Sequence, residues 1–333
     1  MDKASEAKGL SQGLRGRLTG PAGAMVFLVL LIAVFQLVLP QGILNPATLS
    51  VIMSTSAVTI VVALAQMVVL GSGGFNLSIG ATGGLSAVGF GWALVGLQLN
   101  PVVAAVFAVL IGVAAGSING LLVGRVGLSP FIATLATASV FAGTALGLTE
   151  SQPFTGLPEL VTDTGSASLL GVPWLFIAAL GTAAFVGALF RFAPTGRQIL
   201  ALGASPKSAK VSGMRSARLL VITYALSGAL GAWAAVLLVS RLGTAQPIAG
   251  SDWLLISFAA PILGGTLLSG GYVTATGTAV GAVILSVLSV GLIQAKVSPF
   301  YSSLVAGFII LAAAVLDRVR RTQTEQGKTR KQS

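Results

Sequence analysis

Apolar residues fill long stretches of the chain, and prolines, glycines and charged residues separate these stretches from one another. Residues 18–124 and 253–295 carry no charged side chain. A helix that crosses a lipid bilayer needs about 20 mostly apolar residues. The pattern therefore predicts an all-α integral membrane fold with about ten transmembrane helices, at residues 22–40, 48–70, 79–98, 101–123, 130–148, 169–190, 219–239, 253–268, 274–293 and 302–316.

Glycines punctuate this pattern in two ways. The segments Gly71–Gly74 and Gly264–Gly271 lie at span ends, where broken or re-entrant helices are expected. Other glycines recur four residues apart, a spacing that lines one helix face without side chains and predicts close packing inside the chain, with a subunit interface as the alternative. These are Gly80 and Gly84, Gly112, Gly116 and Gly120, Gly143 and Gly147, and Gly277 and Gly281.

The distribution of basic residues sets the expected orientation. With ten spans and both termini cytoplasmic, every lysine and arginine except Arg241 and Lys296 falls on the cytoplasmic side, whereas loop 149–168 carries only acidic charges. The domain prediction is a cytoplasmic tail at 1–21, a transmembrane domain at 22–316 and a basic cytoplasmic tail at 317–333. The net charge of +11 follows from this topology, so we expect membrane lipid, not nucleic acid, at the basic tail.

The composition excludes most enzyme chemistry. Only 8% of residues are charged, against about 25% in a typical soluble domain. The chain has no cysteine or histidine, so it lacks thiolate nucleophiles, imidazole bases and the usual zinc ligands. Gly327-Lys328-Thr329 resembles the end of a phosphate-binding loop, but Thr322 stands where that motif needs glycine. The sequence therefore predicts no ATPase site, bound cofactor or metal in this chain.

A tripeptide that occurs twice suggests an internal sequence repeat. Ser129-Pro130-Phe131 opens the fifth predicted span on the cytoplasmic side, and Ser298-Pro299-Phe300 opens the tenth on the outer side. This relation is typical of an inverted repeat, here of spans 2–5 and 7–10.

The predicted cytoplasmic loop 191–218 carries basic residues and no acid. Within it, Ser205 can cap a short helix, Pro206 suits the first turn, and Gly213 suits a left-handed stop. Such a helix indicates docking of a soluble partner. The alternative is a solvated basic loop that only sets topology.

Several motifs now resemble one family. "TGRQILALGASPKSAKVSGM" from Thr195, "SGALGAWAAVLLVSRLGTAQPIAG", "ILGGTLLSGG" and "VSPFYSSLVAGFIILAAAVLD" are similar to the permease subunit of ribose-type ABC sugar importers, as is "GSGGFNLSIGATGGLSAV" at 71–88. The resemblance extends from about Pro46 to Asp317 and keeps the motifs in order. It implies a multi-pass protein of the bacterial cytoplasmic (inner) membrane that imports a sugar. The energy for import would come from ATP hydrolysis by a separate ATPase subunit.

The resemblance also implies partners. These are a second permease copy, an ABC ATPase subunit that uses ATP and Mg, and a periplasmic or extracellular sugar-binding protein. Arg241 becomes a candidate contact for the binding protein, with an ion pair to Asp252 as the alternative. The ATPase-coupling helix is carried over onto Ala204, Ser205, Pro206, Lys207, Ser208, Ala209, Lys210, Val211, Ser212 and Gly213.

Polar side chains within spans are the candidates for the substrate pathway, because each is costly in lipid and amides and hydroxyls suit sugar hydroxyls. The alternative for each is a hydrogen bond between helices. Trp92, Trp174 and Trp253 are expected at the membrane interface. The pathway candidates are Gln66, Asn76, Asn119, Thr134 and Ser257.

Departures from the family pattern refine the expected substrate. Asn76 stands where the family usually has Asp, and Leu254-Leu255-Ile256 stands where relatives often read Glu-Leu-Asp. The lost charges fit a neutral monosaccharide or similar polyol. A branched-chain amino acid-type ABC permease and an ion-coupled secondary transporter are the alternatives. The spans carry no carboxylate well inside them, which disfavours proton coupling more than sodium coupling.

Overall fold

The computed structural model describes residues 21–297 together with Tyr301, Leu304, Gly307 and Phe308. The predicted N-terminal tail up to residue 20, most of the predicted span 302–316 and the tail 317–333 lie outside the described residues.

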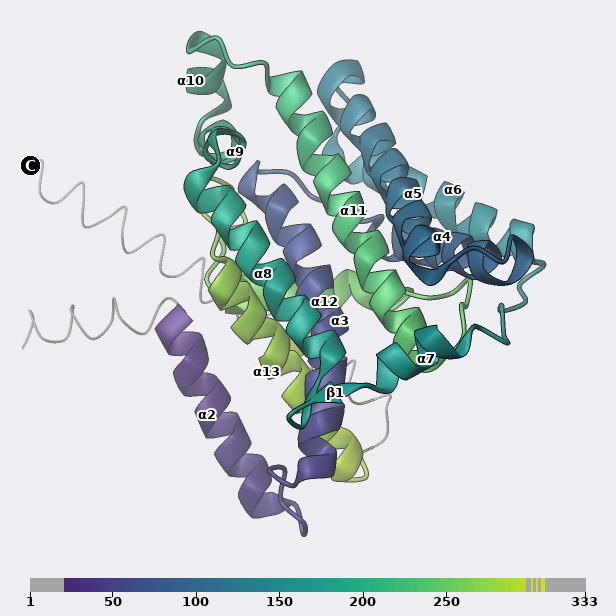
Figure 1. Cartoon of the computed structure of the whole chain (residues 1–333). Helices are drawn as coiled ribbons and strands as arrows, with labels where there is room; N and C mark the ends of the chain where they lie inside the picture. The colour runs from purple at the N-terminus through teal and green to yellow at the C-terminus, as the bar shows by residue number, and fades with distance from the viewer. Residues whose placement is uncertain (1–20, 298–300, 302–303, 305–306, 309–333) are drawn as a thin grey trace, which may run out of the picture.

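The described chain is helical, and its helices follow the apolar stretches (Figure 1). Seven are long and apolar enough to cross a membrane, and two shorter apolar helices lie at Ala22–Val38 and Trp253–Leu263, so the chain is an integral membrane protein with several spans. In order, the helices are α2 (Pro21–Val38), α3 (Pro46–Gly71), α4 (Ile79–Gly91), α5 (Pro101–Leu121), α6 (Pro130–Thr149), α7 (Glu159–Ser166), α8 (Trp174–Phe192), α9 (Pro194–Ala204), α10 (Pro206–Val211), α11 (Ser216–Leu242), α12 (Trp253–Leu263) and α13 (Ala275–Gln294).

Neutral side chains and prolines start the long helices. Asn45 accepts a hydrogen bond from the Thr48 amide at 2.8 Å, and proline opens the first turn of α3, α5 and α6. Proline fits there because a first-turn amide has no partner within the helix. The π-helical turns η1 (Trp92–Gly96) and η2 (Leu122–Val126) extend α4 and α5.

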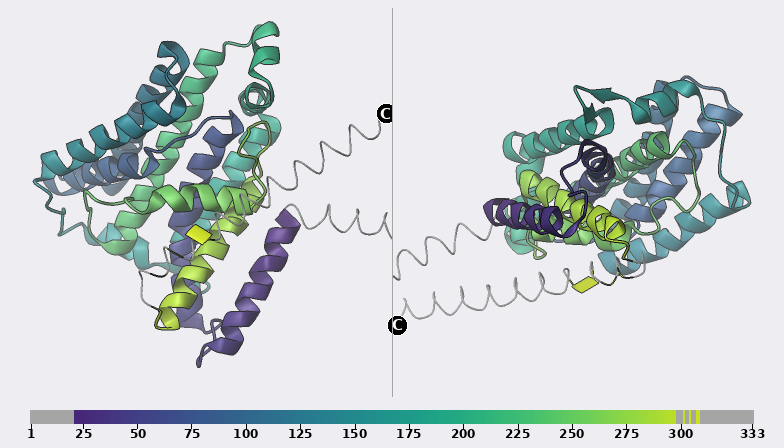
Figure 2. Two further views of the ribbon diagram at one scale, coloured as in Figure 1. Left: turned by 180° about the vertical axis from the view of Figure 1, so that it is seen from behind. Right: turned by 90° about the horizontal axis from the view of Figure 1, so that it is seen from below.

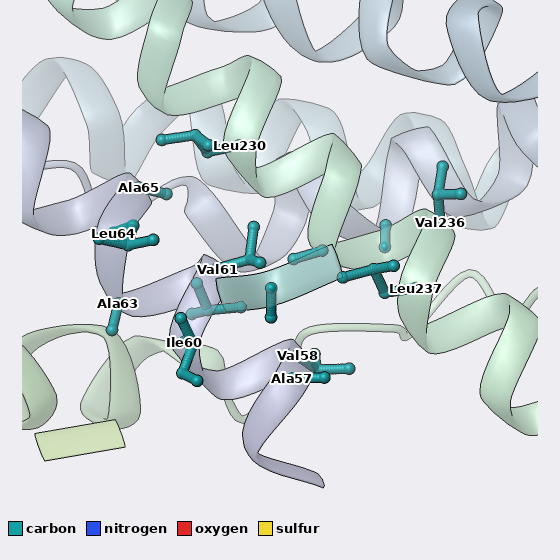
Figure 3. Close-up of a cluster of buried hydrophobic side chains, with 14 of the residues drawn as sticks. Ala57, Val58, Ile60, Val61, Ala63, Leu64, Ala65, Leu230, Val236 and Leu237 are labelled. Atoms are coloured by element: carbon teal, nitrogen blue, oxygen red, sulfur yellow. The ribbon is translucent and has the colours of Figure 1, made fainter. Parts of the chain in front are cut away.

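Helix α3 is the centre of the bundle. Its residues from Ser56 to Gly71 are almost all buried, and it packs against α8, α11, α12 and α13. Viewed from below in Figure 2, α3 is surrounded by the other helices. Figure 3 shows Val61 of α3 and Leu230 and Leu237 of α11 in the apolar cluster that these helices share.

Helices α5 and α11 approach each other through a row of glycines. A methyl group placed on Gly116 would overlap the Tyr224 carbonyl oxygen, and one on Gly112 would overlap that of Gly228. The expected close packing is therefore observed along α5. It is not observed at Gly143 and Gly147 of α6, where an added methyl group meets nothing within 4 Å among the described residues.

The packing partners follow a repeated scheme. Helix α11 packs on α4 and α5, which also pack on each other. Helix α3 packs in the same way on α12 and α13, which again pack on each other. Each central helix thus supports a pair of helices from the other half of the chain.

The segment between α6 and α8 is more structured than the sequence indicated. It contains α7 and a two-stranded hairpin of β1 (Ser168–Leu169) and β2 (Val172–Pro173). The predicted start of the sixth span at residue 169 is wrong, because Leu170 and Gly171 have positive φ and turn the chain before α8 begins at Trp174. In Figure 1, α7 and β1 lie at the end of the bundle opposite α10.

Two other expectations need correction. Helix α12 ends at Leu263 and not at 268, because a glycine turn follows in which Gly265 has φ of +90°. Trp253 is buried against Gly83, so it is a packing residue and not an interface anchor. Trp92 and Trp174 are 45% and 46% exposed, as an anchor at the membrane interface requires.

Candidate functional site

The predicted short helix of the polar loop is present as α10. The Ser205 side chain caps it by accepting a hydrogen bond from the Ser208 amide at 3.2 Å, Pro206 occupies the first turn, and Gly213 follows with φ of +74°. Figure 1 shows α10 projecting at one end of the bundle. The predicted capping geometry is therefore observed, whereas the docking role remains a proposal.

The helix α9 that precedes α10 was not foreseen in the sequence. Its buried Ile199 and Leu202 are three residues apart, on one helix face, and Pro194 opens its first turn. These were the signals for a helix, but the surrounding charges made the segment resemble a loop. Leu202 of α9 packs with Ala209 of α10 and Leu219 of α11. This apolar contact holds the projecting helix α10 against α9 and α11.

One face of α10 is buried and the other is open. Ala209 is 2% exposed, whereas Val211 is 89% exposed. Lys207 and Lys210 are exposed as well. An exposed apolar residue flanked by two cations is a surface suited to a protein partner.

Three of the five pathway candidates lie in one buried polar network. Asn76 donates to the Ser227 hydroxyl at 2.9 Å and accepts from the Ser78 hydroxyl at 2.8 Å. Asn119 donates to Ser78 at 2.7 Å and accepts from Thr137 at 2.6 Å. This chain of bonds joins the turn before α4 to α5, α6 and α11.

Thr134 belongs to the same region, since its hydroxyl accepts from the Leu77 amide at 3.1 Å and donates to the Pro130 carbonyl at 2.7 Å. Sequence reasoning missed Ser78, Thr137 and Ser227, although Thr137 is one helical turn from Thr134. Asn76, Asn119 and Thr134 thus make the hydrogen bonds between segments that the alternative expected, and their pathway role stays a prediction. The amide of Asn76 both donates and accepts here, which an ionised aspartate in its place could not do.

The other two candidates differ from each other. Ser257 of α12 donates to the Leu254 carbonyl of its own helix at 2.8 Å. Gln66 of α3 is fully buried, and neither its amide nitrogen nor its amide oxygen has a hydrogen-bond partner among the described residues. A buried amide without a partner costs free energy, so Gln66 is an exception that calls for a functional explanation.

A cavity of about 360 Å³ lies between α3, α11, α12 and α13. Its polar lining consists of Thr55, Thr59, Arg241, Asp252, Ser286 and Ser289. Gln66 lies four residues beyond Val62, which lines the cavity, so it is the next turn of the same face of α3. Gln66 is thus placed beyond the deep end of the cavity, toward the end of the bundle that carries α9 and α10.

Arg241 faces this cavity. Its guanidinium donates to the Thr55 hydroxyl at 2.9 Å and so joins α11 to α3. Among the described residues, this bond takes the place of the ion pair with Asp252 that was the alternative from the sequence, although Asp252 lines the same cavity. Arg241 is partly buried, so only part of its side chain is open to a partner.

Comparison with known proteins places the chain among transport permeases. The family described as "Branched-chain amino acid transport system / permease component" matches residues 48–314. The chain is 37% identical to the ribose import permease protein of Bacillus subtilis over 89% of its own length and 94% of that protein.

Two further relatives are named for the transport of other molecules. The chain is 32% identical to the D-allose transport system permease protein of Escherichia coli, over 89% of the chain and 91% of the relative. It is 33% identical to the autoinducer 2 import system permease protein of Salmonella paratyphi A, over 84% and 87%. The similarity therefore covers nearly the whole of each relative.

The unpartnered amide of Gln66 leads to a stability prediction. Replacing Gln66 with Met keeps the side-chain size and removes the unsatisfied groups, so we expect unchanged or higher stability, by up to about 1–3 kcal/mol. The matched variant Asn119→Leu removes the bonds of Asn119 to the Ser78 and Thr137 hydroxyls and is expected to lose about that amount. Thermal unfolding of the purified protein in detergent measures both, and equal destabilisation by the two variants would contradict the assignment.

Proposed function

The chain belongs to the transport-system permease family that includes the ribose import permeases, and we propose that it is the membrane subunit of an ABC importer for a neutral sugar or similar polyol. The observation that carries this is the similarity, over almost the full length, to permeases named for ribose and D-allose import. The hydroxyls that line the cavity suit such a substrate, since each both donates and accepts hydrogen bonds.

A permease subunit of this family carries no ATPase site and binds no cofactor, because ATP is hydrolysed by a separate subunit. The importer family also implies a substrate-binding protein. We infer that the partner ATPase uses ATP and Mg, that the binding protein is periplasmic or extracellular, and that the permease works as a dimer in the bacterial cytoplasmic (inner) membrane.

For the membrane arrangement, we propose ten spans with both termini cytoplasmic. The nine apolar helices at the predicted positions and the basic residues around α9 and α10 support it. The matching packing of α11 on α4 and α5 and of α3 on α12 and α13 supports an inverted repeat of spans 2–5 and 7–10. In this orientation, α10 is cytoplasmic, and α7 and Arg241 are on the outer side.

For the motor, we propose that the segment Ala204–Gly213 docks the ATPase. The capped helix α10 offers the exposed Val211 as an apolar anchor, and Lys207 and Lys210 as cations for acidic groups on the partner. The buried Ala209 fixes α10 to the bundle, so a force on α10 is passed to α9 and α11.

For the substrate, we propose that the cavity between α3, α11, α12 and α13 is the outer part of the pathway and that Gln66 is its next contact. The cavity combines hydroxyls with two charged side chains, Arg241 and Asp252, near its outer end. Arg241 then acts at the entrance, where the binding protein delivers its sugar. Of the candidates from the sequence, Gln66 is favoured because its buried amide has no hydrogen-bond partner among the described residues and matches the donors and acceptors of a sugar hydroxyl.

A second candidate function is amino acid import, since the matching family is described by branched-chain amino acid transport. An ion-coupled transporter is the third. Uptake into vesicles that contain the permease, its ATPase and its binding protein separates them. We expect accumulation of a labelled pentose or hexose only with internal ATP and added binding protein, whereas leucine uptake, or uptake driven by an ion gradient alone, would contradict the sugar importer.

The docking surface can be tested at its apolar anchor. We expect Val211→Asp to weaken binding of the ATPase subunit at least about tenfold, because it places a charge at the centre of the contact. The matched control is Leu170→Asp, since Leu170 is 97% exposed in the hairpin at the opposite end. Co-purification and titration of the ATPase give the result, and equal binding by both variants would refute the docking role of α10.

The pathway role of Gln66 can be tested by transport. We expect Gln66→Met to assemble normally but to take up sugar about tenfold more slowly below saturation, because one hydrogen bond to the passing sugar is lost. Ser257→Ala is the control, since the Ser257 hydroxyl is bonded within its own helix. Normal uptake by the Gln66 variant would place the pathway elsewhere.

A further inference from the structure

Three glycine-rich segments meet through their backbones at the end of the bundle that carries α10. The Gly271 amide donates to the Gly71 carbonyl at 3.1 Å. Gly203 of α9 lies against both, because a methyl group placed on it would overlap the Gly71 carbonyl oxygen and lie 2.8 Å from the Gly271 nitrogen. The end of α3, the end of α9 and the turn between α12 and α13 therefore share one junction, which we call the glycine junction (Gly71, Gly203 and Gly271).

At this junction the three glycines contact one another through backbone atoms, and side chains such as Val273 only border it. A methyl group on Gly271 would lie 2.9 Å from Ala204 Cα, and Gly271 also has φ of +81°, which other residues rarely adopt. Side chains absorb small shifts by changing rotamer, whereas backbone packed directly on backbone can only move together or separate. A displacement of α9 would therefore act directly on the backbones of Gly71 and Gly271.

The glycine junction lies next to the proposed docking helix. Ala204 ends α9, Pro206 begins α10, and only Ser205 stands between them. On the other side, Gly71 is the last residue of α3, and Gly271 belongs to the turn that leads into α13. Helices α3, α12 and α13 are three of the four that line the cavity.

We propose that the glycine junction is the mechanical relay that links movement of α10 to the helices around the cavity. Gly203 is its central positioning residue. When the ATPase shifts α10, α9 pushes on the ends of α3 and of the α12–α13 turn at the same moment, which changes the deep end of the cavity near Gln66. This inference rests on the proposed function, since it assigns the path by which ATP hydrolysis drives that transport.

The test separates coupling from assembly. Vesicles containing the full importer with Gly203→Ala are assayed for sugar uptake and for ATP hydrolysis stimulated by the binding protein. We expect assembly and stimulated hydrolysis to persist while the sugar taken up per ATP hydrolysed falls about fivefold or more, the range of an ordinary coupling free energy. The matched control is Gly181→Ala in α8, where an added methyl group meets nothing within 4 Å, and its ratio should equal that of the wild type.

A merely structural role gives a different result. If Gly203→Ala lowers uptake and hydrolysis in proportion, or changes neither, the relay is overturned. If this variant fails to assemble, Gly71→Ala decides by the same ratio, because its methyl group meets the Val273 side chain at 3.1 Å, which can yield. Absence of ATP-dependent sugar uptake by the wild-type importer would instead refute the proposed function.

Discussion

Close approach of helix backbones is the constraint on which this structure depends. Lipid chains are as apolar as leucine, so the hydrophobic effect that gathers helices in water is absent in a bilayer, and dispersion between closely packed surfaces must replace it. The glycines of α5 bring it against α11, and Gly277 and Gly281 bring α13 against Gly264 and Ala260 at the end of α12. These contacts place α3 and α11 together at the centre and leave the remaining helices around them.

The same packing divides the polar groups into two kinds. Around α4, α5 and α6, Asn76, Ser78 and Asn119 bond to one another and stabilise the arrangement of helices, although the buried Ser86 hydroxyl of α4 has no partner among the described residues. Around α12 and α13, the hydroxyls face a cavity, and Gln66 has no partner among the described residues. A polar network in which every hydrogen bond is made is rigid, whereas a polar group without a partner is available to bond a ligand. This contrast supports a pathway on the α12–α13 side.

Local patterns predicted much of this from the sequence, and long-range contacts account for the rest. Hydropathy located the long helices, and the cap at Ser205 with the stop at Gly213 predicted α10. Helix α9 was missed because its apolar stripe is short and lies among charges. The sequence indicated that Asn76 and Asn119 are costly in lipid, but which partners they reach depends on how α4, α5 and α6 pack. The bond of Arg241 to Thr55, far away in the chain, has no local signal at all.

The geometry also separates three tasks that one transporter must perform. In the proposed function, the exposed residues of α10 bind the ATPase, the glycine junction transmits its movement, and the cavity lining contacts the substrate. The junction contains no side chains, so it carries no information about the substrate, and the lining can change without disturbing it. In this scheme, substrate selection depends on the side chains that line the cavity, whereas transmission depends on backbone contacts at the glycine junction.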